Sequence, residues 1–362
     1  MSDSTDFALD DSFADEFFGL SRRCFLLGMG HRRKLAYRSG TLRDAVTGEV
    51  LHTWDAVSER IAPSDYAVRL TTRSGIGVRL WEDEAGIWLE EGRGESAERR
   101  CLSASPVRLP RFEGHPQADA LRALHADILV NIAPAGPLPN FLIYRTPWYR
   151  DAALMLMCLR QTGNLSLAEE WASGLREPFD RNNAGHEEPD NLGQALFIAS
   201  LFGGRAHPLV RAVLDAVPRF EQESHIAGFS DFAPHPVYQT KWLKYGLRSL
   251  GIDDPYRIPA VFDSYSALFW MDYKDAHVPG ARFSADAVRL YPYLGWAEAH
   301  FYGEAPPEPV QAGRYPLSWE ARASQADYRG MARLSPELAA RRIGAPHTWH
   351  SAEMFLYLLE MT

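Results

Sequence analysis

Residues 147–159 read PWYRDAALMLMCL, in which an aromatic and charged opening is followed by an apolar run. A helix that is apolar on every side must be buried, so this stretch predicts an inner helix of a layered helical structure. Further segments open in the same way and lead into apolar runs. They begin with EEPDN at 187–191, PHPVY at 234–238, DSYS at 263–266, YPY at 291–293 and PHTWH at 346–350.

More amphipathic or broken segments lie between these apolar runs, at 166–176, 207–217, 254–260, 281–289 and 318–342. An alternation of fully apolar and half-polar helices predicts an inner and an outer layer. Self-similarity at the length of a helical pair is typical of repeat arrays. The pattern therefore predicts six helical hairpins that close into a ring.

The N-terminal part of the chain has the pattern of β-strands. Segments 66–70 and 77–81 alternate apolar and polar residues and are separated by turn signals. The stretch 106–116 is punctuated by prolines, and after it the apolar residues recur at helical spacing. We therefore expect three regions, which are an N-terminal tail and linker at 1–33, a small antiparallel β-sheet domain at 34–113 and a helical domain at 114–362.

The composition is that of a globular protein, with 46% hydrophobic and 23% charged residues in 362. The net charge is −9, and no basic stripe with interleaved aromatic residues is visible along the sequence, which argues against a nucleic-acid partner. No apolar run reaches the roughly 18 to 20 residues that a membrane-spanning helix needs. We expect neither nucleic acid nor membrane as a partner.

The cysteines and the N-terminal region predict a cytoplasmic protein. Residues 21–27 superficially resemble a twin-arginine export signal, but the apolar stretch stops at the charged residues 31–34 and no cleavage site follows. The cysteines are an odd number without metal-type spacing, which favours reduced thiols. They are Cys24, Cys101 and Cys158.

Aromatic side chains with polar tips gather at the expected starts of the inner helices. Proline and aspartate at such positions are explained by helix capping alone. Capping does not explain the aromatic residues and histidines at the same ends, whereas a sugar site needs flat rings to stack on and polar groups for hydroxyls. The residues are Trp148, Tyr149, His235, Tyr265, Tyr293, His347, Trp349 and His350.

The segment 148–153 resembles the W-x-R-D motif that opens the second helix of glucoamylases and other six-hairpin glycosidases. Residues 190–196, 291–298 and 348–352 resemble the starts of the fourth, tenth and twelfth helices of that family, in the same order. The resemblance covers about residues 148–360. It implies a mostly α fold, with the helical part an (α/α)6 toroid, and a glycoside hydrolase. The small N-terminal antiparallel β domain has no firm match in the family, although such domains often precede these toroids.

Glycoside hydrolysis uses one carboxylic acid and a second carboxylate, and an inverting mechanism is implied because the related toroids mostly invert. The resemblance places the base near the eleventh helix, where Glu320 follows Trp319. The helix dipole favours acidic residues in the first turn of a helix, and this explains Glu320 equally well. The acid is expected before the sixth helix, near Asp231, although a turn-capping role explains Asp231 as well.

Glu187 and Glu188 form an acidic pair in which repulsion would raise one pKa, as a general acid requires, so they stay alternatives to Asp231. His347 and His350 stand three residues apart, but a third ligand at diagnostic spacing is missing, so we expect no metal and no cofactor. The expected substrate-binding residues are Trp148, Tyr149, Arg150, Asp151, Asp190, His235, Tyr238, Asp263, Tyr265, Tyr293, Trp319, His347, Trp349 and His350.

Other functions remain open on the sequence alone. A uronate lyase or epimerase would use Tyr238, Tyr265 or His235 to remove a proton, with Arg150 and Lys241 reading the uronate. A non-catalytic sugar-binding protein would use the aromatic residues as platforms and the acidic residues as helix caps. The fold does not decide between these functions. A carbohydrate is the expected partner of all three.

Overall fold

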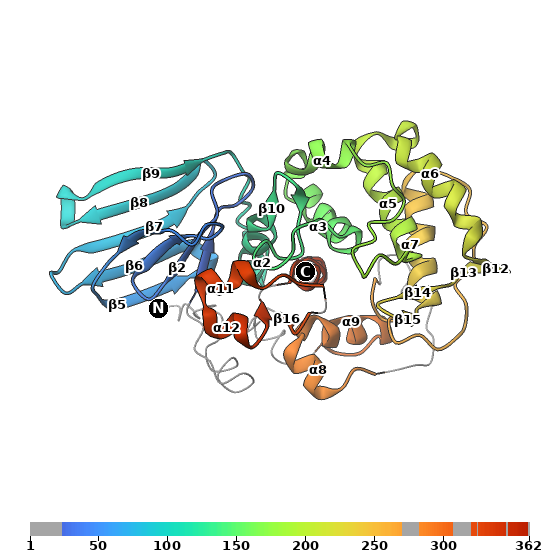
Figure 1. Cartoon of the computed structure of the whole chain (residues 1–362). Helices are drawn as coiled ribbons and strands as arrows, with labels where there is room; N and C mark the ends of the chain where they lie inside the picture. The colour runs from blue at the N-terminus through green and yellow to red at the C-terminus, as the bar shows by residue number, and fades with distance from the viewer. Residues whose placement is uncertain (1–23, 270–281, 307–319, 324, 345–346, 361–362) are drawn as a thin grey trace.

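The computed structural model describes residues 24–269, 282–306, 320–323, 325–344 and 347–360. Two antiparallel sheets form one end of the molecule, and the helices lie beside them (Figure 1). The strands of these sheets run from Phe25 to Ala104. The first strand therefore lies within the stretch 1–33 for which we expected a tail and linker.

Both sheets are simple meanders in which each strand pairs with the next along the chain. The first sheet consists of β1 (Phe25–Leu27), β2 (Leu35–Arg38), β3 (Thr41–Asp44) and β4 (Val50–Thr53). The second consists of β5 (Ala56–Ala62), β6 (Ala67–Thr72), β7 (Gly77–Glu82), β8 (Gly86–Gly92) and β9 (Glu98–Ala104).

The two sheets pack face to face around a common apolar core. Leu35 and Leu42 of the first sheet join Val68, Leu80 and Leu89 of the second in one buried cluster. Successive side chains of a strand point to opposite faces, so the residues between these apolar positions face away from the core. One face of the five-stranded sheet is thus left outside the sandwich.

The helical part follows and surrounds the pocket that is described below. Its helices are α2 (Ala118–Val130), α3 (Tyr149–Gln161), α4 (Glu169–Ser173), α5 (Asp190–Phe202), α6 (Pro208–Ala216), α7 (Pro236–Ser249), α8 (Ala285–Leu290), α9 (Pro292–Tyr302), α11 (Arg329–Leu334), α12 (Pro336–Ala340) and α13 (Thr348–Leu359). Every helix in the described ranges is too short or too polar to span a bilayer.

Short hairpins interrupt the helices. They are β10 (Ile132–Ala133) with β11 (Gly136–Pro137), β12 (Glu221–Gln222) with β13 (His225–Ile226), β14 (Phe229–Ser230) with β15 (Ala233–Pro234), and β16 (Glu320–Ala321) with β17 (Ile343–Gly344). The last of these pairs is not a hairpin, because β16 and β17 lie far apart in the sequence and α11 and α12 stand between them.

The prediction of a mostly α protein built as an (α/α)6 toroid is wrong. The fold mixes antiparallel sheets with helices, and the described residues contain eleven α-helices, several of them a single turn or two, which are too few and too mixed for six complete hairpins. Residues 254–260, expected as an outer helix, are irregular, because Pro255 and Pro259 lack the N–H that a helix needs. Residues 263–269 form turns in place of the expected inner helix.

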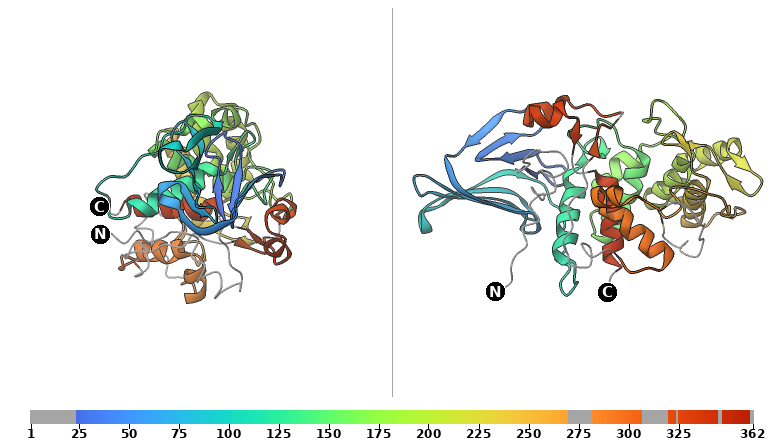
Figure 2. Two further views of the ribbon diagram at one scale, coloured as in Figure 1. Left: turned by 90° about the vertical axis from the view of Figure 1, so that its left-hand side faces the viewer. Right: turned by 90° about the horizontal axis from the view of Figure 1, so that it is seen from below.

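Five long helices nevertheless begin close to the aromatic and polar openings, at Tyr149, Asp190, Pro236, Pro292 and Thr348. Four of these helices, α3, α5, α7 and α13, pack closely against one another. α13 packs against α3 and also against α2, and α5 packs along α7 (Figure 2).

The α5–α7 contact depends on a glycine in each helix. A Cβ atom at Gly193 would stand 2.0 Å from the carbonyl carbon of Trp242, and one at Gly246 would stand 2.5 Å from the carbonyl oxygen of Gly193. No side chain fits at such distances. The two helices therefore approach backbone to backbone, which places the start of α5 against the middle of α7.

Lys34 joins the sheets to the helical part. Its buried ammonium donates to the carbonyl oxygens of Gly28, of Gly30 (2.6 Å) and of Ile132 (2.7 Å), which stands in β10 two residues after the end of α2. Glu82 of β7 accepts hydrogen bonds from the N–H groups of Gly28 and Met29 in the same loop. Backbone groups of both parts are thereby satisfied by one side chain.

We predict that Lys34→Met lowers the free energy of unfolding by about 3 kcal/mol, because it keeps the side-chain length but leaves buried carbonyl groups without donors. Denaturant titration measures this loss. The matched control is Arg33→Met, whose half-exposed ion pair with Asp44 is worth less than about 1 kcal/mol. Equal losses in the two variants would contradict the role given to Lys34.

Candidate functional site

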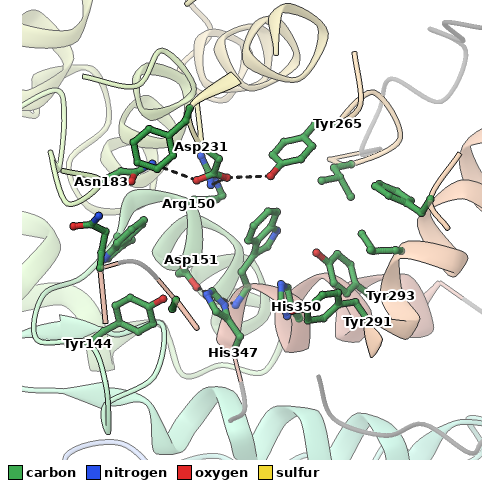
Figure 3. A pocket seen from close by; sticks show the side chains of 18 residues that line it. Tyr144, Arg150, Asp151, Asn183, Asp231, Tyr265, Tyr291, Tyr293, His347 and His350 are labelled. Atoms are coloured by element: carbon green, nitrogen blue, oxygen red, sulfur yellow. Dashed lines mark hydrogen bonds and ion pairs between the residues drawn. The ribbon is translucent and has the colours of Figure 1, made fainter. Parts of the chain in front are cut away.

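A pocket of about 420 Å³ opens among the starts of the long helices. Its walls come from α3, α9 and α13, from the turn of the β14–β15 hairpin and from the turns after residue 263. Figure 3 shows Asp231 and Tyr265 on one side and His347 and His350 on the opposite side. The lining residues are Tyr144, Trp148, Arg150, Asp151, Asn183, Asp231, Phe232, Tyr265, Leu268, Phe283, Tyr291, Tyr293, Leu294, Ala323, Gln325, His347, Trp349 and His350.

Arg150, in the first turn of α3, is the centre of a buried charge cluster. Its Nε and Nη2 donate to Asp190 Oδ2 at 3.1 and 2.9 Å, and its Nη1 donates to Asp231. Glu188 Oε2 lies 3.7 Å from Nη2. The guanidinium is 5% exposed, so carboxylates of the protein itself surround the charge.

Asp190 is the carboxylate bound most tightly in this cluster. It is fully buried at the start of α5, and it also accepts hydrogen bonds from the Ser230 hydroxyl (2.5 Å) and from Gln194 (3.0 Å). Burial by itself would raise the pKa of Asp190, but the charge of Arg150 and these donors outweigh it and hold the pKa below its ordinary value. The ion pair thus joins α3, α5 and the β14–β15 hairpin.

Asp231 is held at the tip of the β14–β15 hairpin. Ser230 pairs with Ala233, so Asp231 and Phe232 form a two-residue turn, and both have positive φ angles of 49° and 66°. Such turns usually carry Asn-Gly or Asp-Gly, because most side chains are strained in this region. Strain of this kind is found where a site requires a side chain in a particular place.

Four groups fix the Asp231 residue. Its N–H donates to Glu188 Oε1 at 2.6 Å, and its Oδ2 accepts from Arg150 and from the Tyr265 hydroxyl at 3.1 Å. Asn183 donates to Oδ1 at 3.4 Å. The carboxylate is 29% exposed and lines the pocket, so of the clustered carboxylates this one faces the pocket.

Glu188 lies behind Asp231 and is nearly inaccessible. Burial and the negative charges of Asp190 and Asp231 together raise the pKa of Glu188 to about 7, although Arg150 opposes them. The adjacent Glu187 points away and pairs with Arg181 (2.5 Å) and with Arg219, and it is not among the lining residues.

Asp151 joins α3 to α13 on the other side of the pocket. Its Oδ1 accepts from the N–H of Trp349 (3.1 Å) and the hydroxyl of Thr348 (3.3 Å), and it lies 3.2 Å from His347 Nδ1. Burial raises the pKa of Asp151, against the effects of His347 and Arg150. The carboxylate satisfies backbone groups at the start of α13, where helices have free N–H groups.

A stack of rings forms the wall next to Asp151. His350 lies between His347 (centroids 4.6 Å apart) and Tyr293 (4.7 Å), with interplanar angles of 25° and 21°. Burial is the main cause that lowers the pKa of His350 well below its ordinary value, and the neighbouring His347 contributes to the lowering. His350 is therefore a neutral imidazole in the folded protein at neutral pH.

His235 and Asp263 support the pocket from behind. Asp263 Oδ1 lies 2.8 Å from His235 Nδ1, and its Oδ2 accepts from the N–H groups of Val237 and Tyr238 at the start of α7. His235 stacks on Tyr265 at 3.8 Å and 8°. The pair thereby fixes the ring whose hydroxyl donates to Asp231.

Comparisons with known proteins identify no relative. No family model, curated protein or solved structure matches the chain. Any function must therefore be argued from the site itself.

The structure brings many of the expected site residues together. Those that line the pocket are Trp148, Arg150, Asp151, Asp231, Tyr265, Tyr293, His347, Trp349 and His350. Others support it without lining it, namely Tyr149, Glu188, Asp190, His235, Tyr238 and Asp263. Trp319 and the side chain of Glu320 lie outside the described residues, whereas the backbone of Glu320 forms β16.

Sequence reasoning missed several lining residues. Tyr144, Asn183, Phe232 and Gln325 lie in loops and turns, where no periodic pattern marks a residue as inward-facing. Of these residues, only Phe232 could have been found from a sequence signal, because it stands beside Asp231 in a short polar and aromatic stretch between extended segments. In the described part of the chain, no group of three or more histidine, cysteine, aspartate or glutamate residues could hold a metal ion.

We predict that Glu188→Gln becomes more stable relative to the wild type as pH rises from about 4 to about 8. An unfolded glutamate has a pKa of about 4.3, whereas the pKa of Glu188 is about 7 in the fold. The folded protein therefore binds the extra proton between these values, and the wild type loses roughly 3 kcal/mol across the interval. The glutamine variant has no such loss.

Denaturant titrations at several pH values measure this difference, with Glu187→Gln as the control. Burial would raise the pKa of Glu187, but Arg219 and Arg181 hold it below its ordinary value, so that group is ionised in both states above pH ~5. The control should show no trend between about pH 5 and 8. If the difference in the free energy of unfolding between Glu188→Gln and the wild type did not change with pH, Glu188 would not be held protonated by its surroundings.

Proposed function

We propose that the protein is a glycoside hydrolase that binds an uncharged sugar unit in the pocket beside Asp231. The observation that carries this proposal is a partly exposed carboxylate, fixed by Arg150 and Tyr265, facing a wall of aromatic rings. Sugar rings stack on aromatic faces, and their hydroxyl groups bind the polar tips of tyrosine, tryptophan and histidine. The volume is within the range of small-molecule sites.

The charges around the pocket support an uncharged ligand. Arg150 is the only arginine or lysine among the described lining residues, and Asp190 and Asp231 already accept from its three donor nitrogens. A free carboxylate on the ligand would meet a cluster with excess negative charge. Electrostatic complementarity therefore disfavours a uronate.

The lyase or epimerase alternative lacks a group to read the uronate carboxylate. Such an enzyme would need Arg150 and Lys241, but Arg150 is occupied. Lys241 is fully buried in α7, where its ammonium donates to the Ser266 carbonyl at 2.5 Å and lies over the Phe301 ring. Neither cation is free for a ligand, so the hydrolase is the better candidate.

Asp231 suits the carboxylate that accepts a proton from water. Its Oδ2 already receives two hydrogen bonds, from a guanidinium and a phenol, so a proton on that oxygen would face two donors. This role differs from the acid role that the sequence suggested for Asp231. It requires another carboxyl as the acid that protonates the leaving oxygen.

Glu320 is our candidate for that acid. It stands in β16, and Ala323 and Gln325, which follow shortly, line the pocket. The chain therefore passes along the pocket wall within a few residues of Glu320. The sequence resemblance assigned this residue the base role, so the two roles are exchanged in the present proposal while the pair is kept.

We predict that Asp231→Asn lowers turnover by about two to four orders of magnitude on every substrate, the usual contribution of a general base. Glu320→Gln should lose as much on a natural disaccharide but much less on a 4-nitrophenyl glycoside, whose leaving group needs little protonation. Initial rates on a panel of both substrate types measure this. Asp231→Asn should also abolish the acidic limb of the pH–rate profile, since a base must be ionised to act.

Glu187→Gln is the control, because Glu187 lies outside the pocket lining and pairs with surface arginines. It should keep wild-type rates. Wild-type-like turnover of Asp231→Asn would refute the catalytic assignment. Binding of sugars without hydrolysis by the wild type would identify a non-catalytic sugar-binding protein instead, and proton NMR of the first product tests the expected inversion.

A further inference from the structure

Phe232 is a strained and exposed residue at the tip of the β14–β15 hairpin. Its φ angle is 66°, and together with Asp231 it forms the two-residue turn of that hairpin. In such turns the second position is usually glycine, because a bulky side chain is strained at positive φ and glycine is not. The backbone of the turn therefore gives no reason for a phenylalanine at this position.

Packing in the core does not explain Phe232 either. The residue is 56% exposed, and it neither belongs to nor packs against any buried apolar cluster of the described residues. Its ring meets the His186 ring edge to face, with the centroids 5.7 Å apart. Strained residues that add little to packing are found where a function requires them. Phe232 lines the pocket, so contact with a ligand would explain its presence.

A loop between α4 and α5 joins Phe232 to Trp148, which also lines the pocket. His186 of this loop meets the Phe232 ring, and the Asn182 amide of the same loop donates to the Pro147 carbonyl at 2.7 Å. Pro147 directly precedes Trp148 in the sequence. The loop thus brings two lining rings, those of Phe232 and Trp148, to one end of the pocket.

This end of the pocket combines aromatic rings with polar groups. Figure 3 shows Asn183 and Tyr144 at this end and Tyr293 at the other. The Tyr144 ring lies 5.6 Å from the Trp148 ring, and Ala323 packs against the same apolar cluster as Trp148. We call it the Phe232 end, and its lining residues are Tyr144, Trp148, Asn183, Phe232 and Ala323.

We propose that the Phe232 end binds a second, uncharged sugar unit, which is linked to the unit beside Asp231 and stacks on the Phe232 ring. The apolar face of a sugar ring packs on an aromatic ring, and its hydroxyl groups need polar partners. The Asn183 amide and the Trp148 indole supply polar groups at this end. A purely apolar ligand group would cover them without offering hydrogen bonds, which makes a sugar the better occupant.

This inference rests on the proposed function, because the second unit would be the leaving group of hydrolysis. Ala323 borders the Phe232 end and follows Glu320, the candidate for the acid, in the same chain segment. In that reaction water forms the new bond to the anomeric carbon and gives a proton to Asp231, while the glycosidic oxygen leaves with the proton of the acid. The expected substrate is thus a disaccharide or a longer oligosaccharide.

Tryptophan fluorescence titration of the full chain measures the binding, since Trp148 and Trp349 line the pocket. The probes are the methyl glycosides of glucose, galactose, mannose and xylose, and disaccharides in which each of these is the non-reducing unit. Fluorescence is read within seconds of mixing, before hydrolysis consumes the sugar. The disaccharide of the preferred sugar should bind about fivefold or more tightly than its methyl glycoside, because it gains the contact with the Phe232 ring.

Phe232→Gly should remove most of this gain and change the affinity for the methyl glycoside by less than about twofold. It should unfold at the wild-type temperature or above, because glycine suits the positive φ and the lost ring is mostly exposed. Phe232→Tyr keeps the ring and should keep the gain. Phe229→Ala is the matched control and should change neither affinity, because Phe229 is 66% exposed on the same hairpin but does not line the pocket.

The outcomes separate this inference from the proposed function. Equal affinity of the wild type for the two kinds of probe, or a gain that survives Phe232→Gly, would overturn the second sugar site even if hydrolysis occurs. A gain with phenyl glycosides but not with disaccharides would overturn the choice of a sugar as occupant. A gain that depends on Phe232 without hydrolysis would refute the hydrolase and keep the sugar site, and no binding of any probe would overturn both.

Discussion

The ion pair between Arg150 and Asp190 determines how the site is built. A buried guanidinium is stable only when carboxylates and hydrogen bonds satisfy it, so its partners are tied to its position. Here the partners come from the start of α5 and from the tip of the β14–β15 hairpin, while Arg150 itself starts α3. One buried charge therefore sets the relative positions of three chain segments and places Asp231 in the pocket wall.

The same cluster explains two unusual features of its surroundings. Three carboxylates around one arginine leave excess negative charge, and burial together with this charge raises the pKa of Glu188, which lies farthest from the guanidinium. The hairpin tip keeps Asp231 and Phe232 in a strained conformation because Glu188, Arg150 and Tyr265 all bind Asp231. The strain is thus compensated by the contacts of Asp231.

The sequence predicted the starts of the long helices but not the arrangement of the chain between them. The openings at 147–151 and 187–191 precede α3 and α5, because an apolar run after capping residues has few other structures open to it. The prediction of a toroid failed at segments with a weak apolar pattern, such as 254–260, where two prolines exclude a helix. Family resemblance at helix starts carried no information about those connections.

The contacts inside the site were likewise only partly predictable from the sequence. Aspartates at helix starts were open to two explanations, and the structure gives Asp151 and Asp263 both, since each binds backbone N–H groups at the start of a helix while bordering or supporting the pocket.

The account depends on Arg150 being satisfied by its carboxylates, which denaturant titration of a double-mutant cycle tests most directly. Arg150→Met alone should lower the free energy of unfolding by about 3 to 5 kcal/mol, because it leaves Asp190 buried without a counter-ion. Adding Asp190→Leu should restore part of that loss, since the fully buried Asp190 carboxylate is then removed with its counter-ion, whereas Glu188 and Asp231 remain. Losses that simply add in the double variant would contradict the central role of the pair.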